Sequence, residues 1–516
     1  MARYSNLYYL IGLLVVLFGS TRVSAKPINL EGIIVNPSAL PIPEKSDYPD
    51  CNYTAMFQVK NILSQDSSIP EKIVLVIPGF RKRKLLTDSI YTSGQRLMVK
   101  IELFDDISET LRQIQQADQI NSLEYDYYYL TEGTRIDQIG PIVRSPVGIS
   151  KNNPLTQPIA DAKKPKLTTQ EKKAAKLRKQ AMQKDLDRIN KLLAKNGGDF
   201  KKWYDNLNDM RREYGKVIEK KDFKWIGDSY FSLKSWALYK EEYLNYDFVS
   251  AMIDYNQYLR DRNIDFIVVR VPSMNEVVGD LFIQSFNNTE FNPYLHEFIK
   301  ILLENDVETI DLVPPLVKNR FKYPLLFWYQ TIDPHPAEGA GRITAQILSD
   351  RIKRYSMRKN KSPRVYLAST TMIPFRDDIY KCDYTWPDGN KKYDTNSAVS
   401  FLGVFSKDGN VLQINENSGS PVLFIGDSFL DYSPYGSRGG SIPQYFYYES
   451  GVLPDKFYRY GGATNLFGEL IRKGDSFLVN RRVVIFIMNS GGILKDAKWF
   501  MINKNSKAAL SAVNRD

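Results

Sequence analysis

From about Phe223 onward, short apolar runs alternate with segments that carry apolar residues at helical spacing. Four runs have the continuous apolar character of strands buried on both faces: Phe266–Val271, Val307–Leu312, Pro421–Ile425 and Arg482–Met488. Three segments predict helices: Asp247–Arg262, Tyr294–Glu304 and Ala340–Arg354. The alternation predicts an α/β domain over residues 223–500 with a mostly parallel sheet. In such sheets active sites gather at the carboxyl ends of the strands.

The chain before this domain has a different texture. The whole chain of 516 residues is longer than a single hydrophobic core usually supports, so two or three domains are expected. Residues 50–140 predict a small all-β domain, because runs rich in β-branched and aromatic residues are separated by polar turns. These predicted strands are Tyr53–Val59, Lys72–Ile77, Leu97–Phe104 and Ser122–Thr131. The polar, proline-containing stretch from Pro141 to Pro165 predicts a linker.

Residues 161–222 predict a basic helical hairpin inserted between the two domains. Thr168 and Glu171 form a capping box, and Asn196-Gly197-Gly198 ends the first helix. Two apolar stripes at helical spacing follow the capping box: Met182, Leu186, Ile189 and Leu193, then Trp203, Leu207, Met210, Tyr214 and Val217. A charged, solvated face over an apolar seam is the favoured interpretation, and binding to an anionic polymer or a membrane surface is the alternative.

The net charge of +11 is concentrated in this hairpin. Between Asp161 and Lys224 there are 20 Lys and Arg and 10 Asp and Glu, a balance of +10, which leaves about +1 for the rest. The charge therefore does not indicate a nucleic-acid partner, and none is expected. Peripheral association with a membrane through the hairpin remains open.

The N-terminus predicts a secretory signal over residues 1–25. An apolar run of about 13 residues from Leu7 to Gly19 follows Arg3 and precedes the small residues Val23-Ser24-Ala25. The run is short of the roughly 20 residues that span a bilayer, so cleavage is favoured over anchoring. A periplasmic or secreted protein is expected. The two cysteines, Cys51 and Cys382, either pair or remain separate thiols.

Histidine is scarce, and this narrows the search for a catalytic base. The chain has two, His296 and His335, and only His335 has a carboxylate two residues away, in Asp333-Pro334-His335. Histidine supplies most general-base chemistry near neutral pH. His296 lies among apolar residues of a predicted helix and is interpreted as structural. No Cys/His spacing of a metal site occurs, so neither a metal nor a cofactor is expected.

Gly-Asp-Ser occurs three times, at Gly227–Ser229, Gly426–Ser428 and Gly474–Ser476. The second copy directly follows the apolar run Val422–Ile425, which places Ser428 on a turn beyond a buried strand. The third follows Arg472-Lys473 and predicts a surface turn. The first copy follows a short possible strand and is a weaker candidate for the nucleophile turn.

Ser428, His335 and Asp333 together form a candidate catalytic triad. A serine hydroxyl is a weak nucleophile until a base takes its proton, and a carboxylate fixes the tautomer of that base. Pro334 and Pro336 restrict φ and stiffen the loop. The alternative interpretation is a loop aspartate that accepts backbone hydrogen bonds beside an exposed histidine.

The chain from Phe223 to about Leu494 resembles the SGNH-hydrolase-like acetyltransferases of the alginate O-acetylation family. The family places a D-x-H motif ahead of the serine, as Asp333–His335 stands ahead of Ser428. The block 266–275 resembles its strand ending in proline and a polar turn, 331–340 resembles its D-x-H loop, and 422–429 resembles its nucleophile turn. The resemblance implies an SGNH-like three-layer α/β sandwich.

Two departures affect the details. The family usually has tryptophan after the histidine, where this chain has Pro336, so the pocket wall differs. The later strand ends in Asn489-Ser490-Gly491, and Asn489 stands where SGNH enzymes keep an oxyanion-hole asparagine. Gly462 is another candidate oxyanion donor, and the backbone N–H of Ser428 is the third.

The resemblance implies an extracytoplasmic O-acetyltransferase that acts on a polysaccharide or other glycan through a serine acyl-enzyme. It also implies a membrane-bound O-acyltransferase as the source of acetyl groups. Two alternatives remain: an acetylesterase with the same triad, and a non-catalytic glycan-binding assembly protein. The aromatic run Tyr445–Tyr448 has two interpretations, a sugar groove and the favoured one, core packing.

Overall fold

The structure is a computed structural model of the whole chain. It describes residues 27–46, 48–64, 69–120, 125–136, 168–210, 212–213, 223–226, 229–232, 244–281, 285–322, 335–355, 357, 365–372, 399–431, 436–461, 464–489 and 499–502. The predicted signal, the predicted linker, Asp333, Gly462 and Cys382 lie outside these residues. None of the described helices has the length and apolar character needed to cross a membrane.

The chain forms two compact units, each described here by itself. Unit 1 comprises residues up to Leu40, Cys51–Ile120 and Glu124–Asn152, and unit 2 comprises the rest. The segment Pro41–Asp50 belongs to unit 2, although its neighbours on both sides in sequence belong to unit 1. Residues 168–210 of the predicted hairpin also belong to unit 2.

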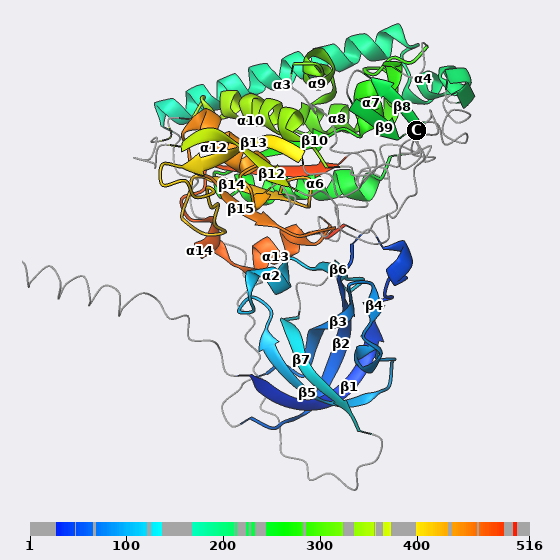
Figure 1. Ribbon diagram of the computed structural model, residues 1–516, viewed down its shortest axis with the longest axis vertical. Coiled ribbons are helices and arrows are strands. Elements are labelled where there is room, and N and C mark those ends of the chain that lie inside the picture. The colour runs from blue at the N-terminus through cyan, green and yellow to red at the C-terminus, as the bar shows by residue number, and fades with distance from the viewer. Residues whose placement is uncertain are drawn as a thin grey trace, which may run out of the picture. The chain divides into compact units, whose positions relative to one another are not determined.

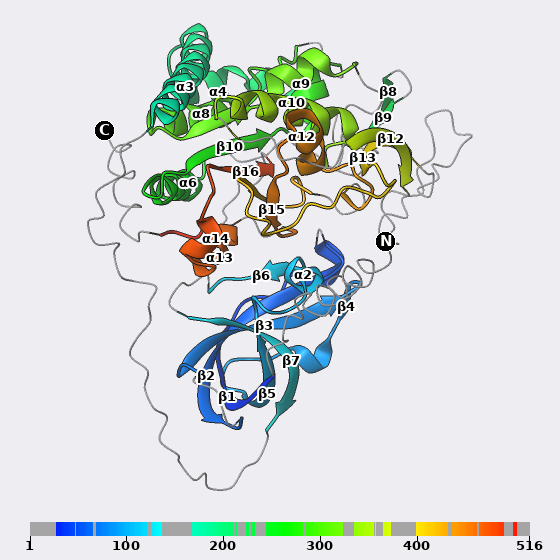
Figure 2. The same cartoon turned by 90° about the vertical axis from the view of Figure 1, so that its left-hand side faces the viewer.

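Unit 1 is a β-barrel. Its strands are β1 (Ile28–Pro37), β2 (Cys51–Ile62), β3 (Lys72–Arg81), β4 (Lys84–Leu85), β5 (Arg96–Leu103), β6 (Gln115–Ala117) and β7 (Tyr127–Arg135). The pairings β1–β2, β2–β3, β3–β7, β7–β5 and β5–β1 close a ring, in which β3–β7 is parallel and the others are antiparallel. Figure 2 shows these strands curving around a common axis.

The barrel has the connections of a Greek key. β5 returns beside β1 to give the spatial order β5-β1-β2-β3, and β7 fills the gap between β3 and β5. Five-stranded Greek-key barrels of this kind include the OB-fold. The interior is filled by alternate side chains such as Leu30, Phe57 and Ile101, all fully buried. Short turns of helix, η2 (Thr87–Ser89) and α2 (Glu109–Arg112), lie between the strands in sequence.

The predicted all-β segment is therefore built of strands. β2 and β3 contain the first two predicted strands, β5 covers the third up to Leu103, and β7 begins at Tyr127, within the fourth. β1 lies before residue 50 and was not predicted. Cys51, at the start of β2, is a buried free thiol whose Sγ–H donates to the Asn52 carbonyl at 3.1 Å. Burial raises the pKa of this thiol to about 12, so it is unreactive at neutral pH.

Unit 2 contains a parallel sheet in the order β11-β10-β16-β14-β15. The strands are β10 (Asp265–Val271), β11 (Glu308–Asp311), β14 (Val422–Gly426), β15 (Asp455–Tyr458) and β16 (Val483–Asn489). Every pairing in this sheet is parallel. The predicted parallel sheet is confirmed, although the edge strand β15 was not predicted.

Helices cover both faces of this sheet. Ile267, Val269 and Phe424 face one cluster, with α9 (Val313–Asn319), α10 (Glu338–Ile352) and α12 (Ile442–Ser450). Phe266 and Val268 face the other, with α6 (Tyr246–Arg260), α8 (Pro293–Glu304) and α13 (Leu466–Arg472). Neighbouring residues of one strand thus enter opposite cores, which is why its sequence is apolar throughout.

Apart from the basic region, the remaining elements of unit 2 lie outside the parallel sheet and the helices that cover it. They are η1 (Pro43–Lys45), the pair β8 (Phe223–Ile226) and β9 (Ser229–Ser232), α7 (Met274–Val278), η5 (Gly279–Leu281), the pair β12 (Val365–Met372) and β13 (Val399–Ser406), and α14 (Asp475–Leu478). Both two-stranded sheets are antiparallel.

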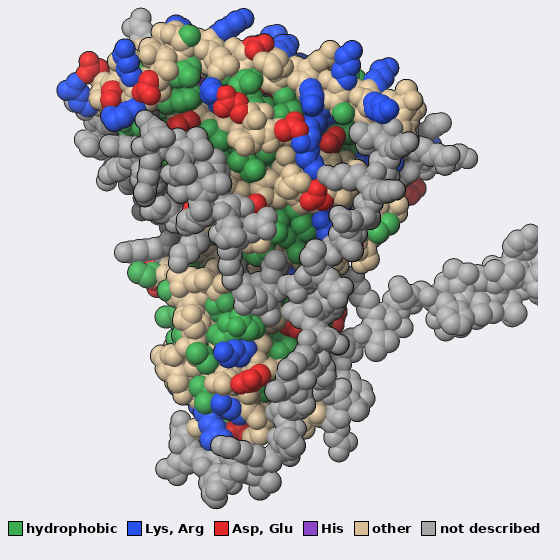
Figure 3. Space-filling view, turned by 180° about the vertical axis from the view of Figure 1, so that it is seen from behind, with side chains coloured by type: hydrophobic (Ala, Val, Ile, Leu, Met, Phe, Trp, Pro, Cys, Tyr) green, Lys and Arg blue, Asp and Glu red, His purple; other side chains and the backbone are tan. Residues whose placement is uncertain are grey.

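The basic region forms the long helix α3 (Thr169–Lys195) and the short helix α4 (Phe200–Asn206). The capping box of Thr168 and Glu171 is present, and Gly197 and Gly198 adopt positive φ after the helix. Met182 and Ile189 of α3 are buried in the same apolar cluster as α6 and α8. Lysine and arginine side chains stand along the upper edge of Figure 3, where α3 runs. The region thus combines an apolar seam with a charged outer face.

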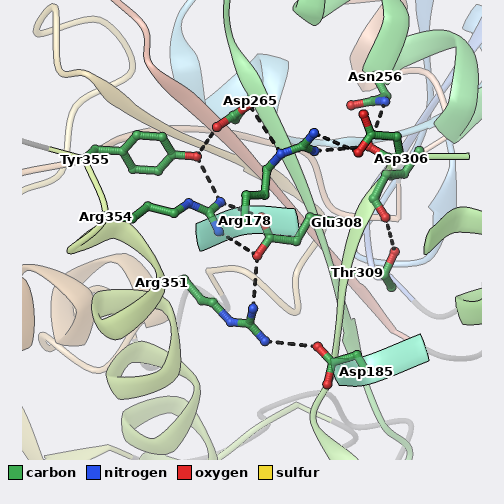
Figure 4. A network of polar contacts seen from close by, with 11 residues as sticks. Arg178, Asp185, Asn256, Asp265, Asp306, Glu308, Thr309, Arg351, Arg354 and Tyr355 are labelled. Carbon is green, nitrogen blue, oxygen red and sulfur yellow. Dashed lines mark hydrogen bonds and ion pairs between the residues drawn. The ribbon is translucent and has the colours of Figure 1, made fainter. Parts of the chain in front are cut away.

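One arginine of α3 is turned inward. Arg178 is 1% exposed and donates to the Asp306 carbonyl at 3.1 Å and to its carboxylate at 2.8 Å. Its Nε lies 3.9 Å from the Asp265 carboxylate at the start of β10 (Figure 4). This side chain therefore joins α3 to residues at the amino ends of the two strands β10 and β11.

The same network reaches α10 through Glu308 of β11. Arg354 donates to Glu308 Oε1 at 2.9 Å, and Arg351 pairs with Glu308 at 3.3 Å and with Asp185 of α3 at 3.1 Å. Buried charges are tolerated only where they are paired and hydrogen-bonded. The network therefore makes α3 an integral part of unit 2.

Replacing Arg178 with alanine is expected to destabilise the protein by about 3 kcal/mol, because Asp306 and Asp265 lose a buried partner. Urea unfolding followed by circular dichroism measures the loss. The matched control is Lys179→Ala, next to Arg178 on the exposed face of α3, with an expected change below about 0.5 kcal/mol. Equal stability of the two variants would contradict the packing role of Arg178.

Candidate active site

Ser428 lies just beyond the carboxyl end of β14, an inner strand of the sheet. The strand is buried along its whole length, and the turn that follows it begins with Asp427. The Asp427 carboxylate accepts a hydrogen bond from the Phe429 N–H at 2.9 Å, and its carbonyl accepts one from the Leu430 N–H at 3.0 Å. These bonds fix a tight turn with Ser428 between them.

Gly426 allows this turn to form against the neighbouring strand. A Cβ atom at this position would lie 2.5 Å from the Ile487 carbonyl oxygen and 2.9 Å from Leu430 Cβ. Ile487 is the partner of Gly426 in the β14–β16 register. Any side chain here would push the two strands apart and move Ser428.

The structure brings His335 to Ser428. His335 Nε2 lies 2.7 Å from Ser428 Oγ, and the imidazole ring packs against Phe429 at 4.9 Å between ring centroids. The exposed fractions are 6% for His335 and 1% for Ser428. His335 stands three residues before α10, so the helix and the strand β14 position the two side chains. An imidazole at this distance from a hydroxyl can accept its proton.

A third side chain reaches the same oxygen. The Tyr48 hydroxyl lies 2.8 Å from Ser428 Oγ, and the Tyr48 ring stacks on Tyr460 with centroids 5.9 Å apart and planes at 19°. Sequence reasoning missed Tyr48, which is separated from Ser428 by 380 positions. No motif marks it. The only local signal is its place before Pro49, in a segment with three prolines.

Asp427 is a buried carboxylate beside the pair. Burial raises its pKa to about 6, opposed by the Phe429 N–H that donates to it and by attraction to His335. The side chain points to its own turn, through the Phe429 hydrogen bond. The Asp427 carboxylate therefore has a structural role in the turn.

Two ion pairs brace the strand ends around Ser428. The Arg459 N–H donates to the Gly426 carbonyl at 3.2 Å, and the Arg459 guanidinium donates to Glu469 of α13, with Nε 2.7 Å from each carboxylate oxygen. Lys456 of β15 donates to Asp431 at 2.5 Å. Arg459, Glu469 and Asp431 are all at most 3% exposed, so this side of the turn is rigid.

The other predicted site residues lie as follows. Asn489 is the last residue of β16, two positions beyond Ile487, and so stands at the same edge of the sheet as Ser428. Gly461, next to the undescribed Gly462, has φ of 62° and follows Tyr460. Among the described residues, no cluster of three or more His, Cys, Asp and Glu side chains is placed to hold a metal ion.

The third Gly-Asp-Ser copy is not part of this site. Gly474 precedes the short helix α14, where Asp475 pairs with Arg262 and Ser476 is exposed, as expected of a surface turn. Gly227 and Asp228 lie outside the described residues. Tyr445, Phe446 and Tyr447 are buried in α12, which agrees with core packing rather than a sugar groove, and Tyr448 is 39% exposed.

His296 is structural, as interpreted from the sequence. It is 3% exposed, its ring stacks on Trp203 of α4 at 5.3 Å, and its Nε2 lies 2.7 Å from the Thr289 carbonyl. Burial lowers the pKa of the ring to about 4, so it is neutral at pH 7 and Nε2–H donates to this carbonyl.

Known proteins resemble this chain only distantly. No protein-family profile and no curated protein matches the sequence. Among solved structures, the O-acetyltransferase domain of Pseudomonas putida AlgJ is 10% identical, with a TM-score of 0.40, over 52% of this chain and 90% of that one. Pseudomonas aeruginosa AlgX is 13% identical, with a TM-score of 0.36, over 52% and 62%. Bacillus cereus PatB1 is 15% identical, with a TM-score of 0.33, over 54% and 99%.

The buried Asp427 makes stability depend on pH. Its pKa in the folded state, about 6, lies above the roughly 3.9 of an unfolded aspartate. Between these values the unfolded chain has lost the proton and the folded chain keeps it, so stability falls as pH rises from about 4 to about 6. A shift of about two units corresponds to roughly 3 kcal/mol.

Asp427→Asn is expected to remove this fall while keeping an acceptor for the Phe429 N–H. Urea titrations at pH 4.5 and 7.5 measure the unfolding free energy of both proteins. From the lower to the higher pH, the stability of the variant relative to wild type should rise by about 2 kcal/mol or more. The titration of His296 is common to both proteins and cancels. Asp350→Asn, at an exposed carboxylate, is the control. A difference that stays constant with pH would contradict a raised pKa at Asp427.

Proposed function

We propose that the chain is an extracytoplasmic O-acetyltransferase that acts on a polysaccharide or other glycan. The observation that carries the proposal is the buried pair of His335 and Ser428, 2.7 Å apart at the carboxyl end of a parallel sheet. Ser428 follows a buried strand, and His335 is the histidine of the two in the chain that has a carboxylate two residues away. Such a pair can act as a nucleophile with its base. The D-x-H order of the sequence and the expected signal support the same assignment.

In the first half-reaction, His335 accepts the Ser428 proton and Oγ attacks the acetyl carbonyl carbon. The bond between that carbon and the donor oxygen breaks, and the donor oxygen leaves with the proton from His335. Asp333 holds the imidazole with its Nε2 toward the serine. The carbonyl oxygen, negative in the tetrahedral intermediate, is stabilised by the Ser428 N–H, with Gly462 and Asn489 as further candidate donors.

In the second half-reaction, a sugar hydroxyl replaces the donor. His335 takes its proton, the sugar oxygen attacks the acetyl carbon, and Ser428 leaves as the free hydroxyl. Acetyl groups are supplied by a membrane-bound O-acyltransferase, and the glycan is the acceptor. An acetylesterase differs only in that water attacks the acyl-enzyme.

Ser428→Ala is expected to lower acetyl transfer by about 10³-fold or more, because the nucleophile is lost. His335→Ala is expected to have an effect of similar size. The measurement is transfer from an aryl acetate to an oligosaccharide, together with mass spectrometry for an acetyl group on Ser428. The matched control is Ser476→Ala, which removes the serine of the exposed Gly-Asp-Ser copy and should leave the rate unchanged.

Three results would overturn parts of the proposal. Wild-type activity in Ser428→Ala would exclude this pair as the catalytic centre. Acetate release that is unaffected by oligosaccharide, with no acetylated sugar, would identify an esterase. Absence of any acetyl-enzyme with normal glycan binding would identify a non-catalytic assembly protein.

A further inference from the structure

Tyr48 enters the candidate active site from a distant part of the sequence. It lies in the segment Pro41–Asp50, which connects β1 and β2 in sequence and belongs to unit 2. The Tyr48 hydroxyl is 2.8 Å from Ser428 Oγ. Neither the D-x-H motif nor the Gly-Asp-Ser motif involves this segment.

Three features hold Tyr48 in place. Its ring stacks on Tyr460, and Tyr460 meets Tyr458 of β15 edge to face, with centroids 5.7 Å apart. Its N–H donates to the Ser46 hydroxyl at 3.3 Å, and Ser46 is 9% exposed. Because Pro49 follows, the backbone at Tyr48 is restricted to extended conformations.

The protons around Ser428 Oγ can be assigned. The oxygen carries one hydrogen and two lone pairs, and it has two partners, His335 Nε2 at 2.7 Å and the Tyr48 hydroxyl at 2.8 Å. If His335 acts as the base, its Nε2 carries no proton and the serine hydrogen points to it. The Tyr48 O–H must then donate to Oγ.

We propose that Tyr48 is a further catalytic residue, whose hydroxyl donates a hydrogen bond to Ser428 Oγ during attack. The inference rests on the proposed function, because it assigns His335 as the base. As Oγ gives its proton to His335 and gains negative charge, the bond from Tyr48 becomes charge-assisted and shorter. No proton leaves Tyr48.

The hydrogen bond from Tyr48 stabilises the negative charge that develops on Oγ. It lowers the reaction barrier without tightening the binding of the substrate. Removing a hydrogen bond to a charged group in the transition state lowers the rate by roughly 10- to 100-fold. The opposite role is a blocking one, in which Tyr48 occupies the path of the acyl donor and its hydroxyl must first move away. The two roles predict opposite effects of removing the hydroxyl.

The test is Tyr48→Phe in the full chain, which deletes the hydroxyl and keeps the ring on Tyr460. The rate of acetyl transfer from an aryl acetate should fall about 10- to 100-fold in kcat, with KM within about twofold of wild type. A fluorophosphonate probe, followed by mass spectrometry at Ser428, should react more slowly by a similar factor. The melting temperature should change by no more than a few degrees.

Tyr246→Phe is the matched control, since it removes a half-buried hydroxyl that bonds to Glu297 at 3.1 Å and should leave both rates unchanged. Equal probe labelling of Ser428 in wild type and Tyr48→Phe would overturn the inference and leave the proposed function standing. Faster labelling of Tyr48→Phe would replace it with the blocking role. No labelling of wild-type Ser428 and no transfer would overturn the proposed function, and the inference with it.

Discussion

The close approach of β14 and β16 at Gly426 is the constraint on which the site depends. A Cβ atom there would lie 2.5 Å from the Ile487 carbonyl, so only glycine lets the strand end against its neighbour and turn at once. The turn carries Ser428 beyond the sheet, and the loop before α10 brings His335 to it from a segment 93 positions away. Arg459 then secures the outer side, through its N–H on the Gly426 carbonyl and its guanidinium on Glu469. A displacement of β14 would therefore disturb these contacts together.

The central strands could be predicted because burial on both faces makes their sequences apolar, and the main helices because their apolar residues recur at helical spacing. β10, β14 and β16 all coincide with predicted apolar runs. The edge strand β15 was missed because it is short and contains Asp455 and Lys456, whose partners are Arg481 and Asp431. Asp455 is fully buried in that ion pair, a circumstance that hydropathy alone does not reveal. In the site, the pairing of His335 with Ser428 was predicted from the scarcity of histidine together with the family resemblance of the D-x-H and Gly-Asp-Ser blocks. Tyr48 was not, since only the folded chain brings it there.

The basic region shows why a count of charges gives incomplete information about surfaces. Arg178 and Arg188 belong to the positive balance of residues 161–224, yet they pair with Asp306 and with Asp311 at 2.8 and 3.1 Å. Asp311 is 3% exposed in its side chain, and the positive charges of Arg270 and Arg188 hold its pKa well below its usual range despite burial. These arginines therefore neutralise carboxylates at β11 and are not available to an external anion. Within the described part of this region, exposed basic side chains such as Lys172, Lys179 and Lys202 remain for a polymer or a membrane.

Burial of the reacting pair bears on the fate of an acyl-enzyme. Ser428 is 1% and His335 6% exposed, so the base that would activate an acceptor has little contact with bulk water. Transfer to a sugar requires that water, the more abundant nucleophile, be kept from the acyl carbon while the sugar hydroxyl is bound. The Tyr48 hydroxyl occupies a second hydrogen-bonding position on Oγ, 2.8 Å away, and its ring stacks on Tyr460. An esterase has no need of such protection. For the proposed acetyltransferase, such enclosure would limit hydrolysis of an acyl-enzyme at Ser428.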